Sequence, residues 1–317
     1  MKFFKDYKIR FCTFSSLCLA IVFFSSTTAV AQSSDYYFSL YHQNPQAINP
    51  AFSGLGGTSL NTGYRKTVTD FSGSPEMFLM GANVKVGSSE TVRGHGLGGF
   101  VYSRKAGGFQ HAVGGLSYAY HVPLKENLSL SGGAAFYYDR WNLDEEDLRP
   151  RDRSDVKYRE LLDSDGRSTN YDVQVGVALN GESFYFGYTF SQRLGDVDVA
   201  DGADALVGYS GHSFDAGYRR PFAGNFTFLG SAHYKVLTHA DDSYMLAGRV
   251  AYKDVINGGL AYKDGSALAL LLGFRTGKKL GISYAYDVPA TEKSNVSDGA
   301  HEIVLEYRFS GRNMFFW

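Results

Sequence analysis

The stretch Ala300–Phe309, AHEIVLEYRF, decides the fold of this chain. Its side chains alternate in character, and a period of two places them on opposite faces of an extended strand. One face is apolar and ends in aromatics: Ile303, Leu305, Tyr307 and Phe309. The other face consists of Glu302, Val304, Glu306 and Arg308, and three of these four carry charges, of both signs. The apolar face would meet a second sheet in a soluble sandwich, or lipid in a membrane barrel with a wet lumen.

The composition indicates an all-β protein. The 317 residues include 24 phenylalanines, 23 tyrosines and 37 glycines but only 7 prolines, which is typical of strands and turns. A formal net charge of −1 argues against nucleic acid as a partner. A mean hydropathy of −0.21 argues against a helical membrane bundle but fits a barrel, because half of each barrel strand is polar.

Residues 1–31 read as a signal peptide. Basic residues precede the apolar run Phe11–Phe24, and Ala29–Ala31 is a small-residue cleavage site that leaves Gln32 first. A membrane anchor is the weaker interpretation, because the apolar run is short. Both cysteines, Cys12 and Cys18, lie in this segment, so the exported chain would have neither disulfides nor a thiol nucleophile.

Residues 32–57 show no alternation. Two Asn-Pro steps, Asn44-Pro45 and Asn49-Pro50, bias the backbone to turns. We expect an ordered non-strand segment, periplasmic or packed in the lumen, because Tyr41, Ile48 and Phe52 would otherwise face water. The alternative is a flexible terminus.

From Thr58 the alternating pattern continues to Phe309, which predicts a transmembrane antiparallel β-barrel over 58–309 and a C-terminal tail over 310–317. About fourteen stretches have the length of a tilted membrane strand. They are 58–66, 76–86, 95–105, 111–121, 127–139, 171–179, 183–193, 212–219, 225–237, 243–252, 256–262, 267–275, 280–286 and 300–309.

The connections separate a barrel from a sandwich. If both chain ends lie in the periplasm, connections alternate between outer loops and inner turns. The three longest, 140–170, 194–211 and 287–299, all fall on the outer side, and short turns such as Asn180-Gly181 fall on the inner side. A sandwich predicts no such parity.

The 140–170 connection carries dense charge of both signs, including Asp144, Arg149 and Arg151. Such runs are usually solvated loops, and the functional alternative is a loop that docks a partner. Trp141, at its start, is either a partner contact or an aromatic of the membrane interface.

Motifs of enzyme chemistry are weak. Gly94–Gly99 satisfies G-x-G-x-x-G, but a strand rather than a helix follows, so close packing of a neighbour explains it better than a dinucleotide. Asp163–Gly166 resembles the start of a calcium loop, but Gln174 stands where a bidentate carboxylate is needed. We therefore predict no catalytic residue, no cofactor and no metal, although a barrel hydrolase without a motif is an alternative. Lumen-facing charges, Arg249, Glu306 and Arg308, would be a selectivity patch or pair with one another.

A family resemblance rests on several motifs. The N-terminal run Asn44-Pro45 with Ile48–Gly54 is followed by Tyr64-Arg65-Lys66, and the interior runs are Gly96–Gly99, Ser117–Leu124 and Leu128–Gly133. With the final His301–Phe309, these motifs cover nearly all of the exported chain, which resembles the PorP/SprF family of type IX secretion system membrane proteins.

The resemblance implies a non-enzymatic outer-membrane barrel of the Bacteroidota, serving protein secretion and in some members gliding motility. Its implied partners are a secreted, adhesin-like surface protein with a type IX C-terminal domain, periplasmic ring or peptidoglycan-binding components, and outer-membrane lipid. We expect Asn44, Pro45, Asn49, Pro50 and Phe52 to serve the periplasmic components, and Trp141, Asp144, Arg149 and Arg151 the secreted partner. The alternative function is an outer-membrane channel for small solutes.

Overall fold

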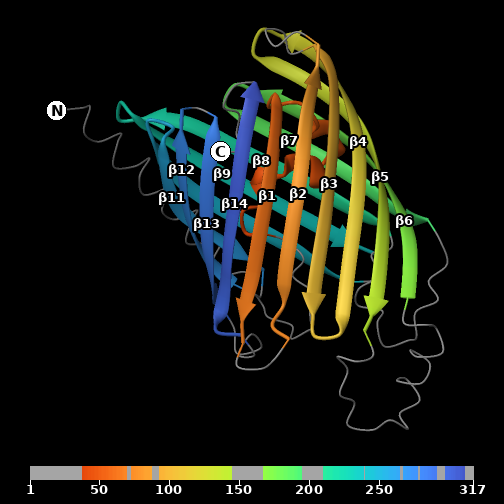
Figure 1. Ribbon diagram of the computed structural model, residues 1–317. Helices are drawn as coiled ribbons and strands as arrows, with labels where there is room; N and C mark the ends of the chain where they lie inside the picture. The colour runs from red at the N-terminus through yellow and green to blue at the C-terminus, as the bar shows by residue number, and fades with distance from the viewer. Residues whose placement is uncertain are drawn as a thin grey trace, which may run out of the picture. The chain divides into compact units, whose positions relative to one another are not determined.

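The computed structural model describes residues 38–69, 73–87, 93–144, 167–194, 210–238, 240–264, 267–277, 279–290 and 297–310. Within them, fourteen antiparallel strands follow one another around a closed barrel, and β1 pairs with β14 to close it (Figure 1). In the described segment from residue 38, three 3-10 turns precede the first strand. The predicted all-β barrel with an N-terminal non-strand segment is confirmed.

The elements in chain order are η1 (Tyr41–Gln43), η2 (Pro45–Ala47), η3 (Pro50–Phe52), β1 (Thr58–Val68), β2 (Glu76–Val86), β3 (Gly94–Ala106), β4 (Phe109–Lys125), β5 (Leu128–Leu143), β6 (Arg167–Gly181), β7 (Phe184–Leu194), β8 (Gly211–Phe222), β9 (Phe226–Leu237), β10 (Ala240–Tyr252), β11 (Ile256–Lys263), β12 (Ala267–Thr276), β13 (Leu280–Pro289) and β14 (Gly299–Ser310). No helix among the described residues has the length and apolar composition needed to cross a bilayer.

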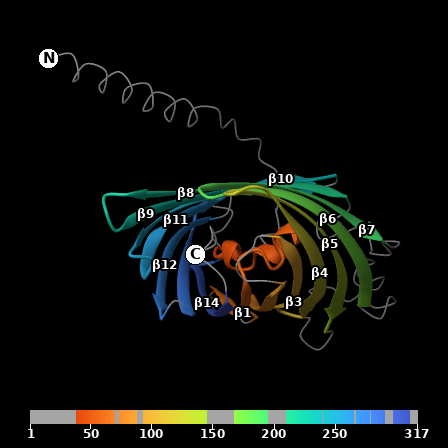
Figure 2. The ribbon, with the colours of Figure 1, turned by 90° about the horizontal axis from the view of Figure 1, so that it is seen from above.

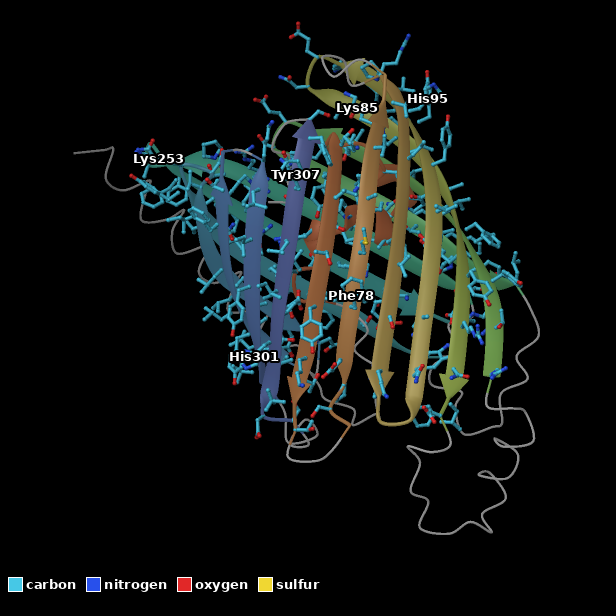
Figure 3. The ribbon with its side chains drawn as sticks, in the orientation of Figure 1. Phe78, Lys85, His95, Lys253, His301 and Tyr307 are labelled. Carbon is cyan, nitrogen blue, oxygen red and sulfur yellow. The ribbon has the colours of Figure 1, made fainter. Side chains whose placement is uncertain are left out.

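The alternation predicted for the last strand is present in β14. Its apolar set faces outward, with exposed fractions from 40% at Leu305 to 55% at Phe309, and the labelled Tyr307 lies on the outer face (Figure 3). Its charged set faces the lumen, where Glu302 is 1% exposed and Arg308 8%. Outward apolar and inward polar side chains are the arrangement that a barrel in lipid requires.

The connections sort by length as the sequence predicts. The stretches 144–166, 195–210 and 290–298 follow β5, β7 and β13, and alternate connections of an up-and-down barrel lie at the same end. We call this the long-connection end. The opposite, short-turn end carries the turns after β4, β6, β8, β10 and β12, and β1 begins and β14 ends there.

Two predicted boundaries are wrong because β5 and β6 are longer than their alternation suggests. β5 continues to Leu143, so Trp141 lies inside a strand rather than at the start of a loop. At its other end β6 runs through Asn180-Gly181, which were predicted as a turn. These ends continue as strand because they pair with each other, from Arg140 opposite Thr169 to Asn142 opposite Arg167. Beside them, Arg193 of the neighbouring β7 donates to Asp139 and to Asp172, at 2.9 Å each.

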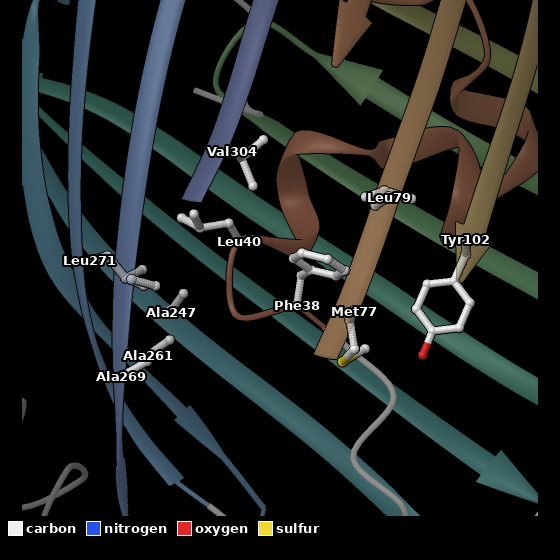
Figure 4. Packing of buried hydrophobic residues seen from close by; sticks show 11 residues of the cluster. Phe38, Leu40, Met77, Leu79, Tyr102, Ala247, Ala261, Ala269, Leu271 and Val304 are labelled. Atoms are coloured by element: carbon white, nitrogen blue, oxygen red, sulfur yellow. The ribbon is translucent and has the colours of Figure 1, made fainter. Parts of the chain in front are cut away.

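The lumen contains a hydrophobic cluster at the start of the described chain. Phe38 and Leu40 are 5% and 3% exposed, and they pack among inward side chains of the wall (Figure 4). The other buried members are Met77, Leu79, Tyr102, Ala247, Ala261, Ala269, Leu271, Ala285 and Val304. Four alanines on β10 to β13 leave the space that these two residues fill.

The lipid-facing assignment predicts a depth-dependent cost of charge. Leu272 and Leu268 are both outward on β12, 49% and 43% exposed, but Leu272 lies nearer the middle of the strand. We expect Leu272→Arg to lower the free energy of unfolding by about 2–4 kcal/mol, and Leu268→Arg by about 0–1 kcal/mol. Urea titration of the barrel refolded into lipid vesicles measures both values, and equal costs would contradict the assignment.

Candidate functional site: the N-terminal plug in the barrel lumen

Residues 38–57, which we call the plug, lie inside the barrel. Figure 2 shows their 3-10 turns within the ring of strands. Ser39 lies beside Glu302, near the start of β14 at the long-connection end. Ser53 lies beside Gly96, near the start of β3 at the short-turn end. The plug therefore runs through the lumen toward the short-turn end before β1 begins.

The two Asn-Pro steps shape the plug. Pro45 and Pro50 occupy the first positions of η2 and η3, where a missing N–H costs nothing. The side chain of Asn49 accepts a hydrogen bond from the backbone N–H of Ala51 at 2.9 Å, which caps η3. Its amide nitrogen donates to the carbonyls of Val177 and Tyr188, at 3.3 Å each. One side chain thus caps η3 and ties the plug to β6 and β7.

Glycines of the wall leave room for the plug. A Cβ on Gly96 would lie 1.8 Å from the carbonyl oxygen of Ser53, and a Cβ on Gly133 would lie 2.5 Å from the carbonyl carbon of Pro50. A Cβ on Gly176 would lie 2.1 Å from the Asn49 Oδ1. The Gly94–Gly99 motif therefore lies in β3 and allows close approach of another backbone, as its strand context indicated.

At the long-connection end, the plug binds a four-charge cluster of the wall. The backbone N–H groups of Ser39 and Leu40 each donate to the Glu302 carboxylate at 2.8 Å. The Ser39 hydroxyl donates to Asp287. Asp287 itself pairs with Arg65 at 2.6 Å and Lys263 at 3.0 Å. The cluster contains two acids and two bases, so burial leaves no net charge.

In the middle of the lumen, two plug side chains reach β9 and β10. The Tyr41 hydroxyl donates to Ser231 at 2.9 Å, and burial raises the pKa of Tyr41 to about 12. The Nε2 of His42 accepts a hydrogen bond from the Arg249 guanidinium at 2.7 Å. Burial, with the Arg249 charge, lowers the pKa of His42 well below its ordinary value. His42 is therefore neutral at physiological pH and serves as an acceptor.

At the short-turn end, the plug is tied to β2 and β4. The hydroxyls of Ser53 and Ser117 are 2.7 Å apart, and the His121 Nε2 donates to the Ser53 carbonyl at 2.9 Å. The Asn83 amide donates to Gln46 at 2.5 Å, and its oxygen accepts from the Gly54 N–H at 3.2 Å. Three side chains of the wall, Asn83, Ser117 and His121, therefore hold the plug at this end.

The structure groups some predicted site residues and separates others. Asn44, Pro45, Asn49, Pro50 and Phe52 come together in the plug, buried against the wall. Their binding to periplasmic components stays a prediction, since their contacts here are with the barrel itself.

Trp141 lies apart from the plug. It stacks on His111 with ring centroids 3.8 Å apart, on the lumen side of β5, so it is neither a loop residue nor an outward aromatic at the membrane interface. Asp144 follows β5 directly, and Arg149 and Arg151 lie outside the described residues, as do residues 1–31 and the Asp163–Gly166 stretch.

Sequence reasoning missed most wall partners of the plug, such as Glu302, Asp287, Ser117 and His121. The available signal was a polar residue at an inward position of an alternating strand. That signal did identify the pairing of Glu306 with Arg308, at 2.9 Å, whereas Arg249 bonds the plug instead. Within the described part of the chain, no group of three or more His, Cys, Asp or Glu side chains is placed to hold a metal.

Comparison with known families decides the identity. The model of a family described as type IX secretion system membrane protein PorP/SprF matches residues 30–307. The chain belongs to the PorP/SprF family. It is accordingly a membrane component of type IX secretion, and its closed barrel lies in the outer membrane. A search of curated proteins found no match.

Solved structures share the barrel fold with this PorP/SprF member at low identity. Omp33 of Acinetobacter baumannii is 9% identical with a TM-score of 0.49, covering 81% of this chain and 100% of its own. The toluene transporter TodX of Pseudomonas putida is 10% identical with a TM-score of 0.48, covering 85% and 96%. The NanC porin is 11% identical with a TM-score of 0.41, covering 80% and 100%.

The close approach at Gly96 predicts a way to displace the plug. A leucine there would clash with the Ser53 carbonyl, whereas Gly114 on β4 has open space around its Cβ position. In a Ser53→Cys background, we expect Gly96→Leu to raise the rate of maleimide labelling at position 53 about tenfold or more, since a loss of about 1.4 kcal/mol suffices. Gly114→Leu should leave the labelling rate at position 53 slow, because Ser53 is 0% exposed. Equal rates would show that the base of the plug is not held by this contact.

Proposed function

We propose that this PorP/SprF-family barrel is a non-enzymatic component of type IX secretion that supports the export or surface anchoring of an adhesin-like partner, rather than a solute channel. The observation that carries the proposal is the anchoring of the plug. Its hydrogen bonds reach β1, β2, β4, β6, β7, β9, β10, β13 and β14. A lumen crossed by such bonds favours an accessory over a steadily open pore.

The plug also favours two separate contact regions. Its chain enters β1 at the short-turn end, where periplasmic components would meet the barrel. The long connections emerge at the other end, where Asp144 and the expected contact residues Arg149 and Arg151 follow β5. We infer that the secreted partner docks there, because charge of both signs suits specific polar recognition.

The solute-channel alternative is tested by locking the plug. Both cysteines of the sequence lie within residues 1–31, and Ser53 and Ser117 have hydroxyls 2.7 Å apart, so Ser53→Cys with Ser117→Cys places two sulfurs within bonding reach. We expect wild-type and oxidised double-variant barrels to be equally silent in planar bilayers, and Gly96→Leu to conduct. Steady wild-type conductance that the disulfide abolishes would support a gated solute channel instead.

The secretion role is tested by a cross-linked pull-down of a tagged copy from native outer membranes. We expect recovery of a surface protein with a type IX C-terminal domain, of periplasmic ring components, or of both. Arg149→Ala with Arg151→Ala should reduce recovery of the surface protein and leave the ring components unchanged. Recovery of neither class from membranes that contain abundant folded barrel would contradict the proposal.

A further inference from the structure

The outer wall carries an apolar groove that runs from β5 to β9. Its volume is about 490 Å³, and its lining includes Val177, Phe186, Phe214, Ala216 and Ala232. Phe186, Phe214 and Val177 are 58%, 48% and 51% exposed, so the groove opens on the membrane-facing side of the wall and not on the lumen. The plug lies behind the same strands, since Asn49 donates to the carbonyls of Val177 and Tyr188, whose side chains face outward into the groove.

Strand register explains why the wall is hollow here. One row across the strands is Phe186, Ala216, Ala232 and Leu246, so two alanines lie side by side between larger residues. The neighbouring row is Val177, Tyr188, Phe214, Tyr234 and Tyr244, which is aromatic over four strands. The small alanine side chains therefore form the floor of the groove, and the aromatic row forms one of its sides.

One end of the groove is polar. The Tyr188 hydroxyl lies 2.8 Å from the Nδ1 of His212, and the Tyr234 hydroxyl donates to Asp242. His212 is the second residue of β8, and Asp242 the third of β10, and both strands start at the long-connection end. Both tyrosines therefore line the apolar groove with their rings and direct their hydroxyls toward that end, as aromatic residues do at a membrane–water interface.

We propose that this groove binds one acyl chain of an outer-membrane lipid, with the headgroup at the Tyr188–His212 end. The outward face of an outer-membrane barrel is in hydrocarbon, so an unfilled depression forfeits dispersion contacts with its lining. Two adjacent alanines make a floor about two strand spacings wide, which suits a flexible chain better than the broad face of a second barrel. The acyl chain comes from a glycerophospholipid or from lipid A, which share this chemistry.

Filling the floor tests the site. Ala232→Phe and Ala216→Leu each place a side chain where the acyl chain would lie, whereas Ala134→Phe adds the same bulk to an exposed position of β5 outside the groove. Barrels extracted in native membrane discs are compared for lipid retained per chain by mass spectrometry. We expect lipid retention to be about tenfold lower in both groove variants, because each displaces about two methylene groups of the acyl chain. Ala134→Phe should retain as much lipid as the wild type.

The retained mass distinguishes glycerophospholipid from lipid A, and either supports the proposal. Heat-modifiable mobility on gels confirms that each variant is folded, and Ala216→Leu is the smaller change should Ala232→Phe not fold. A photo-cross-linker at Leu246, beside the floor, gives a second reading in intact membranes. Unchanged lipid retention in folded groove variants, or a protein as the main cross-linked product at Leu246, would overturn the proposal.

Discussion

Backbone pairing in lipid is the constraint on which this structure depends. Hydrocarbon offers no partner for an N–H or C=O group, so a sheet that spans a membrane must close on itself. Closure is achieved by pairing β1 with β14, from Thr58 opposite Ser310 to Val68 opposite Gly299. The two strands are far apart in sequence, so the barrel is complete only when both chain ends of the sheet are in place.

Closure creates an interior that must be filled, and the chain fills part of it with its own plug. The wall is adapted to this at the level of single atoms, because Gly96, Gly133 and Gly176 lack the Cβ atoms that would overlap the plug. Wall charges are balanced locally, as in the cluster of Arg65, Lys263, Asp287 and Glu302. Burial of charge is tolerable when each carboxylate has a cation and further hydrogen bonds.

The sequence predicted the strands, their faces and the sorting of the long connections, because alternation is a local signal that each strand carries in full. It did not predict the partners of the plug. Leu40 and Glu302 are 262 residues apart, and their contact depends on the shear with which fourteen strands close. The polar ends of β5 and β6 were predicted as loop for the same reason, since the pairing of Arg140 with Thr169 forms only in the assembled wall. Alternation shows which residues face inward but not which of them meet.

The chemistry of the contacts shows how the plug can close the lumen without being locked in it. Most of its bonds are neutral, and the Arg65–Asp287–Lys263–Glu302 cluster remains charge-balanced without it. Arg249 is different: no ion pair involves it within the described residues, and its acceptor is the neutral His42 of the plug. Withdrawal of the plug would remove that acceptor from the guanidinium and two N–H donors from Glu302, and hydrogen bonds to charged groups contribute more than neutral ones. The closed state is thus favoured most at the charged contacts of the plug, with Arg249 in the middle of the lumen and with Glu302 at the long-connection end.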